Sequence, residues 1–397
     1  MLKYVDIFAG CGGLSLGFYN ANWKAVFAVE KSPFAFSTLK HNLIDNKKHF
    51  EWVEWLEVKE NDIENVLKKH KKELKQLQGT IDLVVGGPPC QGFSSAGKRE
   101  KNDERNNLVY SYIDFIKLVQ PKALFFENVK GFSLPFKDDE EVKNVAYSEI
   151  VLEKLKFLGY KAKPKLIDFG EFGVPQRRKR FIIVGFKEKD PQTFFDLLEA
   201  RKEEFLKTKK LTADNKTEDA ISDLLYSNGT VSSPDSKKYL AGIYSEAKSN
   251  LQKYLRSENG DSGKVVDSHR FTKHKEENVE IFEMLLREAK RNIKINGKER
   301  EKYNLKKRGI TVMDGKSKSP TLTTHPDDYI HYSEPRILTV REYARLQTFP
   351  DWFEFKKKYT TGGKLRRFEV PRYTQVGNAI PPLFAELVAV VLKEILE

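Results

Sequence analysis

Short apolar runs alternate with amphipathic stretches along the first 186 residues. Strands are predicted at five of these runs, residues 4–8, 25–29, 81–85, 123–126 and 180–185. Helical spacing lies between or after them, at residues 14–19, 33–43, 63–77, 108–119 and 150–158. Continuous apolar strands separated by helices are typical of an α/β fold with a mostly parallel sheet and helices on both faces.

The pattern changes after Phe186. From residue 187 to about 333 the chain is polar and shows few apolar strands, which indicates a second domain or a large insertion. Helical patterns return at 339–349 and 382–396, and the second of these is apolar enough to pack back on the first domain. We therefore divide the chain into segments 1–186, 187–333 and 334–397.

Charge adds a candidate partner. The 397 residues include 70 Lys and Arg against 57 Asp and Glu, a net charge of +13 that favours a polyanion such as nucleic acid. A solvated lysine-rich surface explains the same surplus equally well. Within the polar segment, basic residues gather between 290 and 308, and this basic cluster is either a phosphate-contacting surface or a solvated helix face. Its members are Lys290, Arg291, Lys294, Lys298, Arg300, Lys302, Lys306, Lys307 and Arg308.

Several classes of protein are disfavoured by composition. No apolar run approaches the roughly 20 residues of a membrane-spanning helix, and the first residues lack the apolar core of a signal peptide. The two cysteines, Cys11 and Cys90, exclude a disulfide scaffold and make a cysteine-rich zinc site a poor interpretation. We expect an intracellular protein without a bound metal.

A glycine-rich turn follows the first predicted strand. Its sequence is Asp6-Ile7-Phe8-Ala9-Gly10-Cys11-Gly12-Gly13, and Glu30 ends the next strand, 20 residues after Gly10. Glycines let a ligand approach the backbone, and a carboxylate at that spacing accepts hydrogen bonds from ribose hydroxyls. Ser15 stands where a dinucleotide motif needs glycine, so S-adenosylmethionine fits better than a nicotinamide cofactor. An ordinary tight turn remains the alternative.

Cys90 lies in a loop after the buried run at 81–85. A lone cysteine is most often a small core residue, but here Pro88 and Pro89 precede it and Gly92 follows it. Prolines and glycines in a loop at the carboxyl end of a parallel strand present a thiol rather than bury it. The pattern therefore predicts a nucleophile, followed by a polar stretch, 95–107, able to close over a substrate.

Glu127 ends another apolar run, at the sheet edge where Cys90 is expected. A carboxyl group there is a candidate proton donor. If residues 176–180 are extended, Arg178 and Arg180 point to one face and could orient Glu127 or hold a polar substrate group. A salt-bridged strand end and a solvated basic turn are the corresponding structural alternatives.

Six blocks in this order resemble the DNA (cytosine-5)-methyltransferases. They are the glycine-rich turn, Pro88-Pro89-Cys90-Gln91, Glu127-Asn128-Val129, Gln176-Arg177-Arg178-Lys179-Arg180, Arg341-Glu342-Tyr343-Ala344-Arg345-Leu346-Gln347 and Gln375-Val376-Gly377-Asn378-Ala379-Ile380-Pro381-Pro382. The resemblance covers residues 4–186 and about 318–396. It implies a Rossmann-like S-adenosylmethionine-dependent methyltransferase sheet in 1–186, a smaller target-recognition domain in 187–333, and a return segment in 334–397.

The resemblance also implies a reaction and its catalytic residues. Cys90 would attack C6 of a cytosine flipped out of duplex DNA, and Glu127 would hydrogen-bond N3 and the exocyclic amine as charge develops. C5 would then take the methyl group. Arg180 resembles the arginine that contacts the carbonyl oxygen of the base, and Arg178 is its neighbour in the motif.

Binding residues follow in the same way. The cofactor residues implied are Phe8, Gly10, Gly12, Gly13, Leu14, Glu30, Asp62, Ile63, Pro89, Leu108 and Asn378. Phe8 would lie on the adenine, Glu30 would hold the ribose and Asp62 would meet the adenine amine. The DNA-contacting residues implied are Ser94, Lys98, Arg105 and Gln176.

The expected partner is double-stranded DNA with a specific short site, and for a prokaryotic modification enzyme of this type a cognate restriction endonuclease is a candidate second partner. We expect a cytoplasmic monomer associated with the nucleoid through DNA. Three alternatives stay open: an RNA cytosine-5 methyltransferase of the same fold, a catalytically silent DNA-binding protein, and a nicotinamide-dependent oxidoreductase. The large polar segment disfavours the first alternative, the presence of Cys90 and Glu127 the second, and Ser15 the third.

Overall fold

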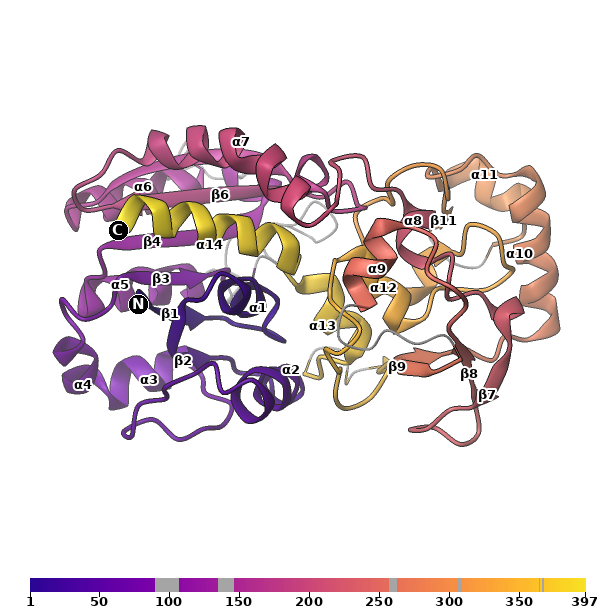
Figure 1. Cartoon of the computed structure of the whole chain (residues 1–397), viewed down its shortest axis with the longest axis horizontal. Helices are drawn as coiled ribbons and strands as arrows, with labels where there is room; N and C mark the ends of the chain where they lie inside the picture. The colour runs from indigo at the N-terminus through magenta and orange to yellow at the C-terminus, as the bar shows by residue number, and fades with distance from the viewer. Residues whose placement is uncertain (90–106, 135–145, 257–262, 306–308, 364, 366–367) are drawn as a thin grey trace. The chain divides into compact units, whose positions relative to one another are not determined.

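The computed structural model describes the chain except for residues 90–106, 135–145, 257–262, 306–308, 364 and 366–367. Its contacts divide the chain into two compact units (Figure 1). Unit 1 comprises Met1–Asp168, Lys179–Lys202 and Phe384–Glu397, and unit 2 comprises Phe169–Arg178 and Glu203–Leu383. Unit 1 therefore extends past Phe186, and most of the segment from 334 onward clusters with unit 2.

Unit 1 contains a six-stranded sheet, in the order β2-β1-β3-β4-β6-β5. The strands are β1 (Lys3–Ile7), β2 (Lys24–Val29), β3 (Leu83–Gly86), β4 (Ala123–Val129), β5 (Lys161–Asp168) and β6 (Lys179–Phe186). The pairs among β1 to β4 are parallel, and β6 runs antiparallel to both β4 and β5. The predicted α/β, Rossmann-like fold class is confirmed.

Helices cover both faces of this sheet, because strand side chains alternate between two apolar layers. The unit 1 helices are α1 (Gly13–Asn20), α2 (Pro33–Leu39), α3 (Ile63–Lys69), α4 (Lys71–Gln76), α5 (Asn107–Val119), α6 (Tyr147–Phe157), the part of α7 (Pro191–Thr208) up to Lys202 and the part of α14 (Pro382–Leu396) from Phe384 onward. Val5 and Ile7 pack with α3, α4, α5 and α6 in one layer.

The other layer holds α1 and α14. Tyr4, which alternates with Val5, stacks on Phe18 of α1 with 4.7 Å between ring centroids. A Cβ at Gly17 would lie 2.4 Å from Ala385 of α14, so only glycine permits this close approach. Trp23 donates from Nε1 to the carbonyl of Ala389 at 3.0 Å. The C-terminal helix is therefore part of the core of unit 1 (Figure 1).

Unit 2 holds two three-stranded sheets. One is β7 (Thr230–Ser232), β8 (Leu240–Ile243) and β9 (Val265–Arg270), and the other is β10 (Lys294–Ile295), β11 (Ile310–Val312) and β12 (Tyr329–Ile330). Its helices are α8 (Thr217–Ile221), α9 (Asn250–Arg256), α10 (Glu276–Glu288), α11 (Gly297–Lys302), α12 (Val340–Leu346) and α13 (Arg372–Asn378). Strands of two to six residues are too short to show clear periodicity, so the sequence predicted few of them. Across the described part of the chain, the helices are too short or too polar to span a membrane.

Candidate active site

The glycine-rich turn leaves β1 through left-handed backbone. Phe8, Gly10 and Gly12 have φ values of +62°, +57° and +94°, and helix α1 begins at Gly13. Glycine adopts this conformation without strain. A Cβ on Gly12 would also press on Leu43 at 3.2 Å, whereas a Cβ on Gly10 would meet no atom within 4 Å. Open space thus lies beside the Cα atom of Gly10.

Glu30 joins this turn to two other segments. Its Oε2 accepts a hydrogen bond from the Gly10 amide at 2.9 Å, and its Oε1 accepts one from the Ser32 amide at 2.7 Å. Its backbone carbonyl accepts from the Asn61 amide at 2.8 Å. Burial raises the pKa of Glu30, and the hydrogen bonds from Ser32 and Gly10 oppose that rise. The carboxyl group therefore fixes the turn while it lies at the end of β2.

Asp62 follows Asn61 and caps α3. Its carboxylate accepts from the Glu64 amide at 2.9 Å and pairs with Lys31 at 2.7 Å. Burial tends to raise the pKa of Asp62, but the hydrogen bonds from Lys31 and Glu64 outweigh it and the pKa lies below its ordinary value. Asp62 is thus an ionised acceptor one residue away from the segment that Glu30 holds.

These groups fit an adenosine-containing cofactor. Two carboxylates, a helix N-terminus and the open space at Gly10 supply acceptors, amide donors and room. Of the other predicted contacts, Phe8 and Leu108 are half-buried, Leu14 and Ile63 are buried and Pro89 is exposed. Asn378 is exposed at the end of α13 in unit 2, and its part in cofactor binding stays a prediction.

Asp6 is a buried acid beneath the turn that the sequence reasoning did not single out. Its Oδ2 accepts a hydrogen bond from Ser15 Oγ at 2.5 Å, and its Oδ1 has no hydrogen-bond partner among the described residues. Burial raises the pKa of Asp6 to about 7; the Ser15 hydrogen bond lowers it and Glu30 raises it further. A charged residue inside the apolar run 4–8 was the available signal.

The loop that leads to Cys90 begins where β3 meets its neighbours. A Cβ on Gly86 would lie 2.4 Å from the carbonyl of Ile7, and one on Gly87 would lie 2.8 Å from Oε2 of Glu127. Asn128 Nδ2 also donates to the carbonyl of Pro88 at 3.3 Å. The start of the loop is therefore held against the end of β4. Beyond it, four predicted site residues lie outside the described residues: Cys90, Ser94, Lys98 and Arg105.

Glu127 forms an ion pair with Arg180, with 2.8 Å between Oε1 and Nε. The two side chains are 14% and 13% exposed. In the antiparallel β4–β6 pairing Arg180 lies opposite Val129, so Glu127, two residues away, shares its face and is a diagonal neighbour. The arginine thus orients a carboxyl group that lies against Gly87, at the base of the loop before Cys90.

Arg178 does not share this arrangement. It is 2% exposed and belongs to unit 2, where its Nη2 donates to the carbonyl of Gly377 at 2.8 Å and its Nη1 to that of Leu322 at 3.3 Å. Its guanidinium holds backbone rather than facing Glu127. The expectation that Arg178 and Arg180 act together is corrected, because β6 begins only at Lys179 and the strand period does not reach Arg178.

The prediction that the Gln176 side chain contacts DNA is also corrected. Its side chain is fully buried, accepts from the Leu322 amide at 3.0 Å and donates to Oε1 of Gln347 at 3.0 Å. A side chain without exposure and with its amide bonded inside unit 2 does not contact DNA. We assign Gln176 a structural role in unit 2.

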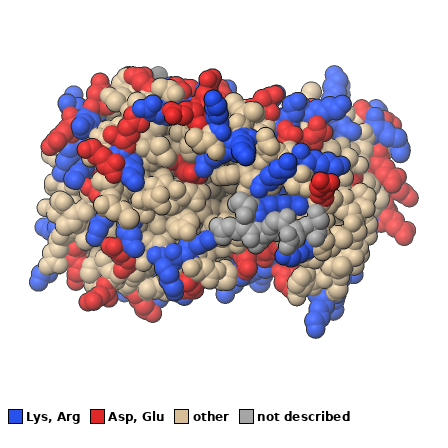
Figure 2. All heavy atoms as spheres, viewed as in Figure 1, with Lys and Arg blue, Asp and Glu red and all other residues tan. Residues whose placement is uncertain are grey.

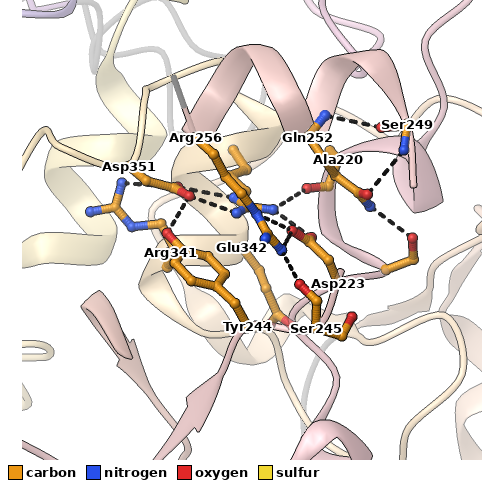
Figure 3. A network of polar contacts seen from close by, with 12 residues as sticks. Ala220, Asp223, Tyr244, Ser245, Ser249, Gln252, Arg256, Arg341, Glu342 and Asp351 are labelled. Carbon is orange, nitrogen blue, oxygen red and sulfur yellow. Dashed lines mark hydrogen bonds and ion pairs between the residues drawn. The ribbon is translucent and has the colours of Figure 1, made fainter. Parts of the chain in front are cut away.

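Unit 2 contains a buried ionic network (Figure 3). Arg345 of α12 pairs with Asp223 at 2.5 Å and with Asp351 at 2.6 Å, and all three side chains are fully buried. Arg256 of α9 pairs with Asp223 as well, and Tyr244 donates to Asp351. The charges in this network form ion pairs with one another, so we assign the network a structural role in unit 2 rather than a catalytic one. The sequence showed Arg345 only as part of a matching block.

Comparisons with known proteins identify the family of this chain. A family model described as C-5 cytosine-specific DNA methylase matches residues 2–394. Type II methyltransferase M1.HphI of Haemophilus parahaemolyticus is 30% identical, over 98% of this chain and 86% of its own. Type II methyltransferase M.DdeI of Desulfomicrobium norvegicum is 28% identical, over 98% and 88%. The solved structure of Entamoeba histolytica methyltransferase EhMeth is 13% identical with a TM-score of 0.55, over 100% of this chain and 99% of that one, a likeness of fold.

Proposed function

The chain belongs to the family of C-5 cytosine-specific DNA methylases, and from this premise we propose that it methylates C5 of a cytosine in duplex DNA as the modification enzyme of a restriction–modification system. The relatives named as Type II methyltransferases support the modification role. The observation that carries the chemistry is the Glu127–Arg180 pair against Gly87, at the start of the loop that bears Cys90.

S-adenosylmethionine, when bound, supplies the methyl group. Glu30, at the end of β2, would accept hydrogen bonds from the ribose hydroxyls, and Asp62 would accept one from the adenine amine. The open space at Gly10 admits the ligand to the backbone of the glycine-rich turn, and Phe8 contributes a half-buried ring to the same end of the sheet. These assignments rest on the carboxylates and the turn that the structure brings together.

Cys90 is the nucleophile in this proposal. Its thiolate forms a bond to C6 of the flipped cytosine. The C5=C6 pair shifts to C4=C5, and the N3=C4 pair takes up a proton from Glu127 at N3, which leaves C5 as the nucleophilic carbon of an enamine. C5 would then take the methyl group from the sulfonium of the bound cofactor, whose sulfur would keep the electron pair of the broken bond as S-adenosylhomocysteine leaves. Loss of the C5 proton to a base, with breakage of the bond between sulfur and C6, restores the aromatic ring and frees Cys90 as thiolate, and N3 returns its proton to Glu127. Arg180 holds Glu127 in place and can donate to the carbonyl oxygen of the base.

The three strand ends that meet here explain why these residues act together. Ile7 of β1 pairs with Gly86 of β3, and Gly86 pairs with Phe126 of β4, in parallel register. The glycine-rich turn, the loop before Cys90 and Glu127 therefore leave the same edge of the sheet. Ligands of open α/β sheets bind at this edge, where neighbouring connections diverge.

The test is methyl transfer with defined substrates. The purified chain is incubated with labelled S-adenosylmethionine and either duplex DNA or tRNA, and the product nucleosides are separated. We expect 5-methylcytosine in DNA, with bisulfite sequencing of DNA from an expressing host reporting the target site. Label in tRNA but not in DNA would replace the proposal by its RNA alternative, and label at another atom of cytosine would overturn it.

A further inference from the structure

Two surfaces of unit 2 carry exposed lysines, and their surroundings differ. The basic cluster expected to contact phosphates borders helix α10, and residues 276–302 hold seven acidic and seven basic side chains. Figure 2 shows Asp and Glu side chains gathered at the edge that α10 occupies in Figure 1. Charges of both signs at this density cancel beyond about 10 Å at moderate ionic strength.

Part of the cluster is also engaged inside the protein. Arg291 donates to three backbone carbonyls, those of Leu286, Met313 and Tyr332, at 2.8, 3.3 and 3.0 Å. Lys302 pairs with Glu288 at 3.1 Å. The described part of the cluster therefore presents less free positive charge than its sequence suggests.

The β7–β8 turn is different. It spans Ser233–Tyr239 and extends from the body of unit 2 in Figure 1. Lys237 and Lys238 are both exposed at this turn, and Asp235 is its one acidic residue. Arg372 pairs with Asp235 at 2.7 Å and Tyr359 donates to it at 3.0 Å. Arg372 thus neutralises the carboxylate of Asp235, and the remaining charge of the turn is the positive charge of Lys237 and Lys238.

The turn also rests on a stack of rings and guanidinium groups. The Arg270 guanidinium lies 4.1 Å from the Tyr239 ring centre and 3.7 Å from that of Tyr359, and Arg372 lies 4.2 Å from Tyr359. Arg270 Nη1 donates to Ser236 Oγ at 3.1 Å. Stacked planar groups with hydrogen bonds hold a turn in one conformation at low entropic cost. We call Tyr239, Arg270, Tyr359 and Arg372 the tyrosine–arginine stack.

Burial would raise the pKa of Asp235, but the charge of Arg372 and its hydrogen bond outweigh burial, so that pKa lies below its ordinary value. The Asp235 carboxylate therefore stays ionised and bonded at neutral pH. Two more exposed lysines border the stack: Lys273, 5.6 Å from the Tyr239 ring, and Lys357, whose carbonyl accepts from Arg372 at 2.9 Å.

We propose that Lys237 and Lys238 of the β7–β8 turn, positioned by the tyrosine–arginine stack, contact backbone phosphates of duplex DNA, with Lys273 and Lys357 at the margin of the same surface. This inference rests on the proposed function, and it assigns the phosphate contact to this turn rather than to residues 290–308. A rigid turn with lysines and no free carboxylate matches a phosphate backbone, and phosphate contacts set the register of a protein on its site.

The test compares three double variants of the full chain in the salt dependence of binding to a duplex that contains the target site. Lys237→Ala/Lys238→Ala removes the proposed contacts, Lys294→Ala/Lys298→Ala removes charge from the basic cluster, and Lys71→Ala/Lys72→Ala removes two exposed lysines of α4 in unit 1. We expect the first variant to lower the slope of log K against log salt by about two, because each phosphate contact contributes about 0.9. Its affinity should fall similarly for target and non-target duplexes.

S-adenosylmethionine binding should be unchanged in all three variants, which checks that unit 1 is folded. A loss of slope in the Lys294/Lys298 variant with none in the Lys237/Lys238 variant would overturn the inference and restore the basic cluster. Equal losses in all three would show that total charge, not the turn, sets the slope. Methyl transfer by the unaltered chain is measured in the same preparation. Its absence would contradict the proposed function, whereas methyl transfer together with an unchanged slope in the Lys237/Lys238 variant would contradict only this inference.

Discussion

Two arginines that are two residues apart in the sequence serve different parts of the molecule. Arg180, in β6 of unit 1, pairs with Glu127 while both side chains keep some exposure. Arg178, in unit 2, is buried and donates to backbone carbonyls. The same contrast separates the sheet edge of unit 1 from the ionic network around Arg345 in unit 2. Charged groups that retain some exposure can still contact a ligand, whereas charges wholly enclosed by their own partners stabilise the fold.

Two buried carboxyl groups, one in each unit, also differ in their pKa values. Asp6 in unit 1 has no cationic partner among the residues that the structure describes, and burial raises its pKa to about 7. Glu342 in unit 2 is equally buried, but there the Arg336 guanidinium outweighs burial and holds the pKa at about 2. Burial alone therefore does not fix the charge of an acid in this protein; the partner does.

The largest effect on methyl transfer is expected from Glu127→Gln. The amide keeps the shape and can still accept from Arg180, but it cannot deliver a proton. Single-turnover methyl transfer should slow about 10³-fold, within the range for general acid catalysis, while the free energy of unfolding changes by less than about 1 kcal/mol. An unaltered rate would remove Glu127 from the catalytic set.

The second variant, Asp223→Asn, tests how much the buried ionic network of unit 2 contributes to stability. It leaves Arg345 and Arg256 with too little negative charge in a buried site, so the free energy of unfolding in urea should fall by about 3 kcal/mol. The matched control is Asp214→Asn, which breaks an ion pair of a mostly exposed carboxylate with Lys318 and should cost under about 0.5 kcal/mol. Equal costs would contradict the structural role of the network.

The third test uses pH. Because the folded pKa of Asp6 is raised, its contribution to stability is complete below the ordinary value of 3.8 and is lost as pH rises toward about 7. Asp6→Asn should remove this loss, so that the free energy of unfolding of the variant rises relative to that of the unaltered chain by about 3 kcal/mol between pH 4 and pH 7. Urea unfolding at several pH values measures the difference, and parallel curves for both proteins would refute the shift.

The smallest effect is expected from Glu30→Gln. A neutral amide offers one acceptor oxygen in place of two, so the link between the glycine-rich turn and Ser32 loosens. Binding of S-adenosylmethionine, measured by calorimetry, should weaken about tenfold. Glu51→Gln, at a surface ion pair with Lys3, serves as the control and should bind normally.

The sequence predicted the parts of the fold with strong patterns. The apolar run at 382–396 became α14 with the same bounds, and the spacing of Gly10 and Glu30 corresponds to a direct hydrogen bond. Strand β5 was not predicted, because Lys161–Asp168 is a polar edge strand that contains a proline.

The site was predicted less completely. Arg178 and Gln176 could not be placed, because periodicity shows which face a strand residue takes but not where the chain leaves the sheet for another unit. The acid at position 6 was visible in the sequence, yet its altered pKa depends on burial and on Glu30, which the structure brings near it. Partners that lie far apart in the sequence decide such properties, as Leu322 and Gly377 do for Arg178.

The most direct test of the central claim is covalent trapping at Cys90. A duplex with 5-fluorocytosine at the target position is incubated with the chain and S-adenosylmethionine, and the denatured mixture is analysed by peptide mass spectrometry. Fluorine cannot leave C5 as a proton does, so the adduct should persist, map to Cys90 and be absent in Cys90→Ser, which still binds the cofactor. Attachment at another residue, or no attachment by enzyme that methylates the unmodified duplex, would contradict the account.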